Sequence, residues 1–133
     1  MAFQTPSNEV GIPSSVKIFT WVLIGAGSFF FYVYTFKPSL SFPNATLETY
    51  SAQMGFASTG VRILGSVLAL LVSVVANNPR WLFITLVSRV FIELGDVVVG
   101  MVLDGVTTNT LALIILASVE IWAVLNLWKY QNT

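Results

Sequence analysis

The sequence predicts an all-α membrane protein, a four-transmembrane-helix bundle, and three observations support this fold class. Hydrophobic residues make up 56% of the chain and charged residues only 9%, against the ~25% charged content of ordinary soluble domains. The mean hydropathy is +0.82. A spanning helix needs ~20 predominantly apolar residues, so 133 residues have room for four spans with short loops in a single domain.

The first two spans are predicted at residues 16–36 and from about residue 45 to about residue 76. The first contains no charge after Lys17 and ends in an aromatic run, which suits the membrane interface. The second carries Arg62 near its centre. A compact turn is expected at residues 77–80, because its proline cannot continue a helix and disfavours helical geometry at the preceding residue.

The third and fourth spans are predicted at residues 81–103 and 107–128. Asp104-Gly105 is expected to break the chain between them. The fourth span holds Glu120 and ends on Trp128-Lys129-Tyr130, a sequence typical of an interfacial anchor. The membrane domain is therefore predicted at residues 16–128.

The two ends of the chain are predicted to lie outside the membrane on the same side. Residues 1–15 form an N-terminal tail or surface segment and residues 129–133 a C-terminal tail. The N-terminal residues lack the basic start of a signal peptide, so the first span is expected to be retained. The basic residues that flank the spans favour cytosolic termini by three to one, namely Lys17, Arg80 and Lys129 against Lys37.

This orientation places the sequon Asn44-Ala45-Thr46 on the lumenal or outer side, where N-glycosylation occurs. In a eukaryotic cell the expected location is the membrane of the endoplasmic reticulum.

The composition excludes several classes of partner and chemistry. Six basic and six acidic residues cancel, so no basic face exists for nucleic acid. Cysteine and histidine are absent, which removes thiol nucleophiles, disulfides, Ser-His-Asp triads and nearly all zinc, haem and iron–sulfur ligation. We expect no cofactor and no metal, and as partners the lipid bilayer and a lipophilic small molecule. Any chemistry must use carboxylates, arginines, hydroxyls and amides.

Five ionisable residues fall inside the predicted spans: Arg62, Arg89, Glu93, Asp96 and Glu120. A charge at the bilayer centre costs ~2.5–3.5 kcal/mol, so these groups must face one another or a wet cavity. Arg89 and Glu93 are separated by four residues, and Glu93 and Asp96 by three. All three therefore lie on one face of a helix.

Arg62 is expected to make a buried contact with Asp96 or Glu93, because these groups lie at similar depth on neighbouring spans. On its own span, Glu48 precedes Arg62 by two heptads and returns to the same face, with Tyr50 and Gln53 next to the same outer turns.

Two arginines must serve three mid-span carboxylates, so at least one acid is expected to have no cationic partner. Such an acid would stay protonated and serve as a general acid. We predict Asp96 as a base held by Arg62 and Glu93 as the acid. The alternative is that these ion pairs merely fix the register of the helices.

Four short motifs carry a resemblance to a known group of proteins. Residues 60–65 (Gly-Val-Arg-Ile-Leu-Gly), 78–80 (Asn-Pro-Arg), 93–96 (Glu-Leu-Gly-Asp) and 104–105 (Asp-Gly) resemble the small four-helix membrane proteins of the DoxX-like type. Within them, the chain is similar to an uncharacterised family with an arginine in its second span and an aspartate in its third. The resemblance covers about residues 45–128. Arg62 and Asp96 match the polar pair, and Glu93 and Arg89 match it less clearly.

In size and layout the chain is also similar to the small membrane epoxide hydrolases/cyclases of fungal polyketide pathways of the aurovertin and citreoviridin type. This resemblance implies hydrolysis or cyclisation of a lipophilic epoxide. An acid would protonate the departing oxygen while a carboxylate base activates water or an internal hydroxyl on the opposite face. Asp96, Glu93 and Arg62 are the expected catalytic residues. The expected substrate-binding residues are Arg89, Glu48, Tyr50, Gln53 and Glu120.

Two other functional classes remain open on the sequence. A small transporter also needs intramembrane carboxylates. Four spans make a small carrier unless two copies form a homodimer, however, and no broken helix pair or inverted repeat is visible. The other class is an accessory subunit of a membrane complex, including the quinone-linked role associated with some DoxX-like proteins.

Overall fold

The computed structural model describes residues 11–40 and 47–132, and these residues form four long helices with no strand. A short 3-10 helix, η1 (Pro38–Leu40), follows the first of them. The all-α prediction is confirmed, with element ends within a few residues of those expected. The sequon and the first ten residues lie outside the described residues. The four helices are α1 (Ser14–Phe36), α2 (Tyr50–Val75), α3 (Pro79–Asp104) and α4 (Thr108–Gln131).

Polar side chains fix where three of the helices begin. The Thr49 side chain accepts a hydrogen bond from the backbone N–H of Ala52 at the start of α2. Asn78 caps α3 in the same way, with Pro79 as the first helical residue. Thr107 caps α4. Each cap satisfies a backbone donor that has no partner within the helix.

The two tight turns that follow α2 and α3 use residues that tolerate a left-handed backbone. Asn77, at φ +50°, lies in the turn between α2 and α3. Its Oδ1 accepts a hydrogen bond from the backbone N–H of Ile12 at 3.1 Å. Gly105, at φ +72°, lies between α3 and α4, where only residues 105–107 separate the two helices. These turns force consecutive helices to run antiparallel.

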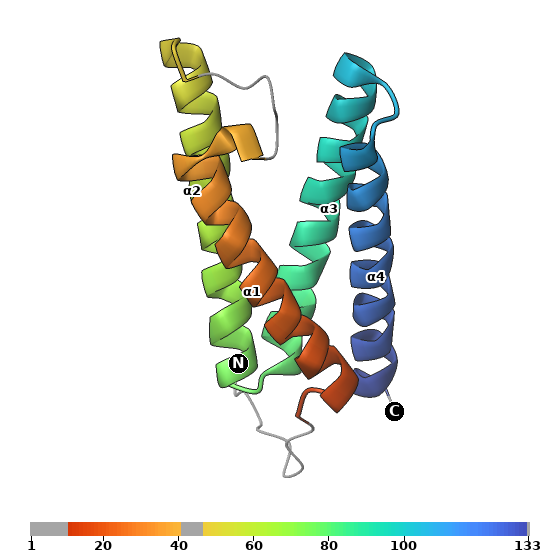
Figure 1. The fold of residues 1–133 in the computed structure, drawn as a ribbon. Helices are drawn as coiled ribbons and strands as arrows, with labels where there is room; N and C mark the ends of the chain where they lie inside the picture. The colour runs from red at the N-terminus through yellow and green to blue at the C-terminus, as the bar shows by residue number, and fades with distance from the viewer. Residues whose placement is uncertain (1–10, 41–46, 133) are drawn as a thin grey trace, which may run out of the picture.

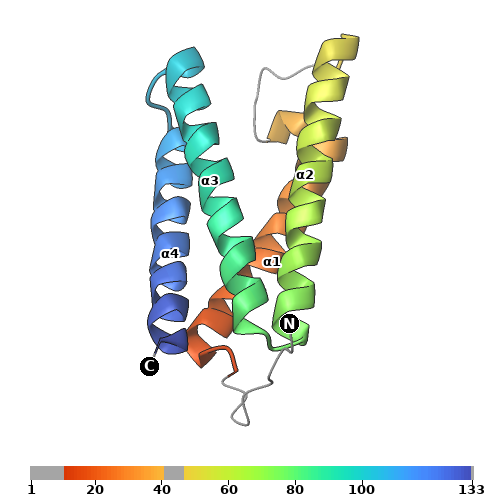
Figure 2. The ribbon, with the colours of Figure 1, turned by 180° about the vertical axis from the view of Figure 1, so that it is seen from behind.

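The helices pack as two antiparallel pairs, α1 with α2 and α3 with α4 (Figure 1). The pairs meet at the end that holds the α2–α3 turn and diverge toward the other end, as the opposite view also shows (Figure 2). The hydrophobic core lies at the converging end and takes residues from all four helices. Its buried members are Ile12, Val16, Leu23, Leu70, Val74, Leu82, Leu86, Ala123 and Leu127.

Glycine permits the close approach of α1 and α2. A Cβ atom on Gly60 would collide with the hydroxyl of Thr35, and one on Gly27 would collide with the side chain of Val67. Small residues at a helix crossing allow backbones to come close, which is the usual basis of helix association in membranes. The α1–α2 pair is thus held along most of its length.

Three helices of the described chain, α1, α2 and α4, are long and apolar enough to cross a membrane. The prediction of four spans is confirmed for these three, and α3 falls short. Every 18-residue stretch of α3 includes Arg89, Glu93 and Asp96, and these charges lower its apolar content. The three apolar helices indicate an integral membrane protein, and the fourth helix, α3, differs from them by the charged residues that it carries.

Candidate functional site

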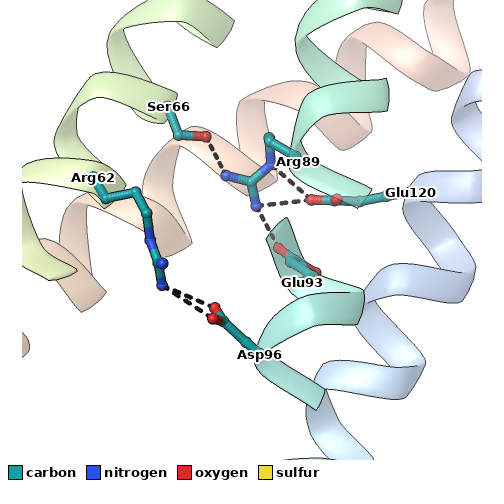
Figure 3. A network of polar contacts seen from close by, with 6 residues as sticks. All are labelled: Arg62, Ser66, Arg89, Glu93, Asp96 and Glu120. Carbon is teal, nitrogen blue, oxygen red and sulfur yellow. Dashed lines mark hydrogen bonds and ion pairs between the residues drawn. The ribbon is translucent and has the colours of Figure 1, made fainter. Parts of the chain in front are cut away.

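The five ionisable residues predicted inside the spans lie near one another around the middle of the helices (Figure 3). Arg62 lies midway along α2, Arg89 and Glu93 lie near the middle of α3, and Glu120 lies midway along α4. Asp96 is one turn beyond Glu93. The region divides into two clusters, each built around one arginine.

The first cluster is the ion pair between Arg62 and Asp96, which bridges α2 and α3. Arg62 Nη2 donates to both carboxylate oxygens of Asp96, at 3.2 Å to Oδ1 and 3.0 Å to Oδ2. The contact agrees with the prediction from depth and spacing. Its predicted burial is wrong, because 47% of the Arg62 side chain and 39% of the Asp96 side chain are exposed. Among the described residues the pair is therefore open on one side, although Tyr34 of α1 lies within electrostatic range of both partners.

The second cluster, the Arg89 trio, consists of Arg89, Glu93 and Glu120. Arg89 Nε and Nη2 both approach Oε1 of Glu120, at 2.8 and 2.7 Å, and Nη2 also donates to Oε1 of Glu93 at 2.8 Å. The third nitrogen, Nη1, donates to the hydroxyl of Ser66 on α2 at 2.6 Å. One guanidinium group thus ties α2, α3 and α4 together.

The Arg89 trio corrects the expectation that one acid would have no cationic partner. Each of the three mid-span acids contacts an arginine, and Glu93 and Glu120 share Arg89 instead of leaving one acid alone. Glu120 is fully buried and the Glu93 side chain is 10% exposed. Burial beside a shared cation, rather than the absence of a cation, is what distinguishes these two acids from Asp96.

A groove of about 230 Å³ lies between α2 and α3 at the level of both arginines. The two guanidinium-bearing residues and three hydroxyl-bearing residues supply polar groups to its wall, and the remaining lining is aliphatic. The carboxyl-bearing residues Glu93, Asp96 and Glu120 are not part of the lining, but Arg62 and Arg89, which bind them, are. The lining residues are Arg62, Ser66, Ala69, Ile84, Thr85, Ser88, Arg89 and Ile92.

Three of the predicted substrate-binding residues lie away from both clusters. Glu48 and Tyr50 are exposed near the start of α2, and the Gln53 side chain donates to the backbone carbonyl of Leu47 at 2.7 Å. Gln53 precedes Arg62 by nine residues, which is about 14 Å along a helix. The structure does not bring these residues to the ionisable region, and their role in substrate binding stays a prediction.

Two polar residues near the clusters were not anticipated from the sequence. Ser66 follows Arg62 by four residues, so the same spacing rule that grouped Arg89 with Glu93 could have found it. Tyr34 is half-buried on α1, packs its ring against Phe56 of α2, and lies within electrostatic range of Arg62 and Asp96. No spacing on one helix reveals Tyr34, because its position depends on how α1 crosses α2.

The chemistry available to the site is proton transfer between carboxyl groups and bound molecules, with guanidinium groups as fixed hydrogen-bond donors. Within the described residues, no three acidic, histidine or cysteine side chains gather in a way that suits a metal ion. Comparisons with protein-family models, with curated proteins and with solved structures find no match for this chain. Its function is therefore argued from the site itself.

Proposed function

We propose that this chain is an integral membrane enzyme that opens an epoxide of a lipophilic substrate by carboxylate general acid/base catalysis, through hydrolysis or cyclisation and without a cofactor. One observation carries the proposal. Asp96 is ion-paired with Arg62 yet remains partly exposed, one helical turn from the buried acid Glu93. A base that a substrate can reach and a second acid beside it are the two groups that epoxide opening needs.

The proposal includes a fourth membrane span. With 26 residues, α3 is about 39 Å long and exceeds the ~30 Å hydrocarbon core. Its three mid-helix charged residues are paired with one another or with α2 and α4, while exposed apolar side chains of α3 include Phe91, Val98 and Val102. A four-span bundle of this kind places both termini on one side, and the three-to-one bias of the basic residues favours the cytosol as that side.

Labelling with a membrane-impermeant thiol reagent tests this topology directly, since the chain contains no cysteine. Ala76→Cys and Val106→Cys flank α3 and should react from opposite sides of sealed vesicles. Phe3→Cys and Asn132→Cys should both react from the side of Ala76→Cys. Reaction of Ala76→Cys and Val106→Cys from the same side would exclude the fourth span. Reaction of the two terminal cysteines from opposite sides would exclude the orientation.

In the proposed reaction Asp96 is the base and Glu93 the acid. Asp96 takes a proton from water or from a hydroxyl of the substrate, and the oxygen so activated forms a bond to one epoxide carbon. The bond from that carbon to the epoxide oxygen breaks, and the released oxygen takes a proton from Glu93. Return of the proton from Asp96 to Glu93 restores the starting state. Arg62 holds the Asp96 carboxylate in place through both of its oxygens.

The groove supports a substrate with a small oxygenated segment and a long apolar remainder. Pockets that enclose drug-sized ligands measure ~300–1,000 Å³, so about 230 Å³ holds only part of such a molecule. The hydroxyl and guanidinium groups of the wall can orient an epoxide oxygen. The rest of the substrate would lie among the lipid chains beside α2 and α3.

Turnover of a lipophilic polyene epoxide by the purified protein in lipid nanodiscs tests the function. Asp96→Asn and Glu93→Gln keep the shape of each side chain and remove its proton chemistry, so each should lower turnover by roughly 10²-fold. Asp104→Asn on the same helix is the matched control, because Asp104 is exposed at the end of α3. Wild-type rates in both folded amide variants would refute the proposed mechanism.

A further inference from the structure

The Arg89 trio contains two oxygen atoms that its hydrogen bonds do not use. Oε1 of Glu93 and Oε1 of Glu120 both accept from Arg89. Oε2 of each residue is buried and has no hydrogen-bond donor among the described residues. Buried polar atoms are nearly always partnered, so two adjacent exceptions in one cluster require a physical explanation.

The charge of the trio requires an explanation as well. Arg89 carries one positive charge, and two ionised carboxylates would leave a net negative charge where the Glu120 side chain is fully buried. An uncompensated charge in such a place costs several kcal/mol. The other nearby cation, Arg62, does not supply the missing positive charge, because it is paired with Asp96.

We propose that Glu93 and Glu120 together bind one proton, held between their carboxyl groups, so that the Arg89 trio is neutral inside the membrane. The two carboxyl groups lie beside each other, because Nη2 of Arg89 contacts Oε1 of Glu120 at 2.7 Å and Oε1 of Glu93 at 2.8 Å. A carboxyl group gains a hydrogen atom to donate only when it is protonated. The proton resides on an Oε2 atom, since both Oε1 atoms are occupied by N–H groups of Arg89. One proton therefore balances the charge of the trio and gives one of the two unused oxygens a hydrogen atom.

The surroundings favour a proton over a metal ion at this position. Sodium and larger cations take several oxygen ligands, whereas the two glutamates offer one free oxygen each and the neighbouring donor, Arg89, repels a cation. The other charged groups nearby are Asp96 on α3 and, through it, Arg62 on α2. Tyr34 of α1 lies within electrostatic range of Asp96 and Arg62.

Binding of the proton is independent of the proposed reaction, whereas its use rests on that reaction. In the reaction described above, the shared proton is the one that Glu93 delivers to the epoxide oxygen. Glu120 would then be a positioning residue, since it is fully buried and keeps the proton on the pair without touching the substrate. A substrate-free measurement can establish the proton site, so its failure is distinguishable from failure of the epoxide chemistry.

Infrared spectroscopy of the folded protein in nanodiscs detects the proton directly. At neutral pH the wild type should show a protonated-carboxyl absorption that shifts when water is exchanged for D₂O. Glu93→Gln and Glu120→Gln should each abolish it, because a glutamine amide replaces the shared proton as donor to the remaining carboxylate. Asp104→Asn should retain the absorption. The proposal is overturned if the wild type lacks the absorption, or if it survives in both glutamine variants.

The pH dependence of unfolding by SDS in mixed micelles provides a second measurement, which can be made on the wild-type protein. Above about pH 5 an unfolded glutamate is ionised, so a folded state that keeps one extra proton loses stability as pH rises. The folding equilibrium constant should fall by about tenfold per pH unit, and Glu120→Gln should remove this slope. A flat wild-type profile contradicts the proposal. The proposal is also contradicted if the slope is absent in sodium and appears only when choline replaces it. Sodium, rather than a proton, would then be the ion bound between the two glutamates.

Discussion

The Arg62–Asp96 pair and the Arg89 trio use the same chemical groups in different surroundings. Arg89 uses all three guanidinium nitrogens, contacts two acids and a serine, and is 14% exposed. Arg62 bonds one acid through one nitrogen and is 47% exposed. A buried, fully hydrogen-bonded arginine holds helices together, whereas an arginine with unused donors beside a groove can bind another molecule. Packing, rather than residue type, separates the two roles.

The position of each cluster along the helices explains the difference. Arg89 precedes Asp96 by seven residues, which places it about 10 Å closer to the end where the two helix pairs converge. At that level α2, α3 and α4 are close enough to surround one side chain. Farther along, only α2 and α3 are bridged, and the ion pair stays open.

The largest effect is expected from Arg89→Ala. This change leaves two buried carboxyl groups without their cation, and breaking one side of a buried ion pair costs about 3–5 kcal/mol. SDS-induced unfolding in mixed micelles measures the loss. Arg80→Ala, at the exposed start of the same helix, should change stability by less than about 0.5 kcal/mol. Equal effects of the two changes would show that the trio does not hold the helices together.

A smaller loss is expected from Ser66→Ala, which removes the one contact of the trio with α2. Interhelical hydrogen bonds in membrane proteins contribute about 0.6 kcal/mol on average and at most about 1.7 kcal/mol. The same unfolding assay should detect this change. Ser58→Ala, two turns earlier on the exposed part of α2, is the control and should be neutral. A neutral Ser66→Ala would mean that this hydrogen bond does not contribute to holding α2 against α3.

The smallest stability effect is expected from Arg62→Ala, despite the formal similarity to Arg89→Ala. We expect water in the groove that Arg62 lines to screen this ion pair, and ion pairs that water screens contribute ~0.2–1 kcal/mol. The variant should therefore unfold at nearly the wild-type SDS concentration while losing epoxide turnover. A loss of 3 kcal/mol or more would show that the pair faces hydrocarbon, which would remove the contrast between the two clusters.

Sequence reasoning predicted the contacts that depend on one helix or on depth alone. The four-residue spacing gave Arg89 with Glu93, and equal depth on neighbouring spans gave Arg62 with Asp96. The partner of Glu120 could not be predicted, because it depends on how α4 is rotated about its own axis. The exposure of Arg62 could not be predicted either, since it follows from the divergence of the helix pairs.

For the fold as well, sequence reasoning predicted what depends on one helix alone and missed what depends on its neighbours. Three helices are apolar enough to span a membrane by their own composition, and the sequence identified each of them. The composition of α3 does not decide its location, because its charges become tolerable only through partners on other helices. A rule that scores one segment at a time cannot include that contribution.

In the proposed four-span arrangement, the short turn at Gly105 has a consequence for how the protein is made. Only three residues separate α3 from α4, and Arg89 of α3 is neutralised in part by Glu120, halfway along α4. Each unpaired charge of α3 would cost ~2.5–3.5 kcal/mol in lipid, so α3 gains little by leaving the translocon alone. The translocon is therefore expected to retain α3 until about half of α4 has emerged from the ribosome. The two helices would then enter the bilayer together as a hairpin, against an α2 that already carries the partner of Asp96.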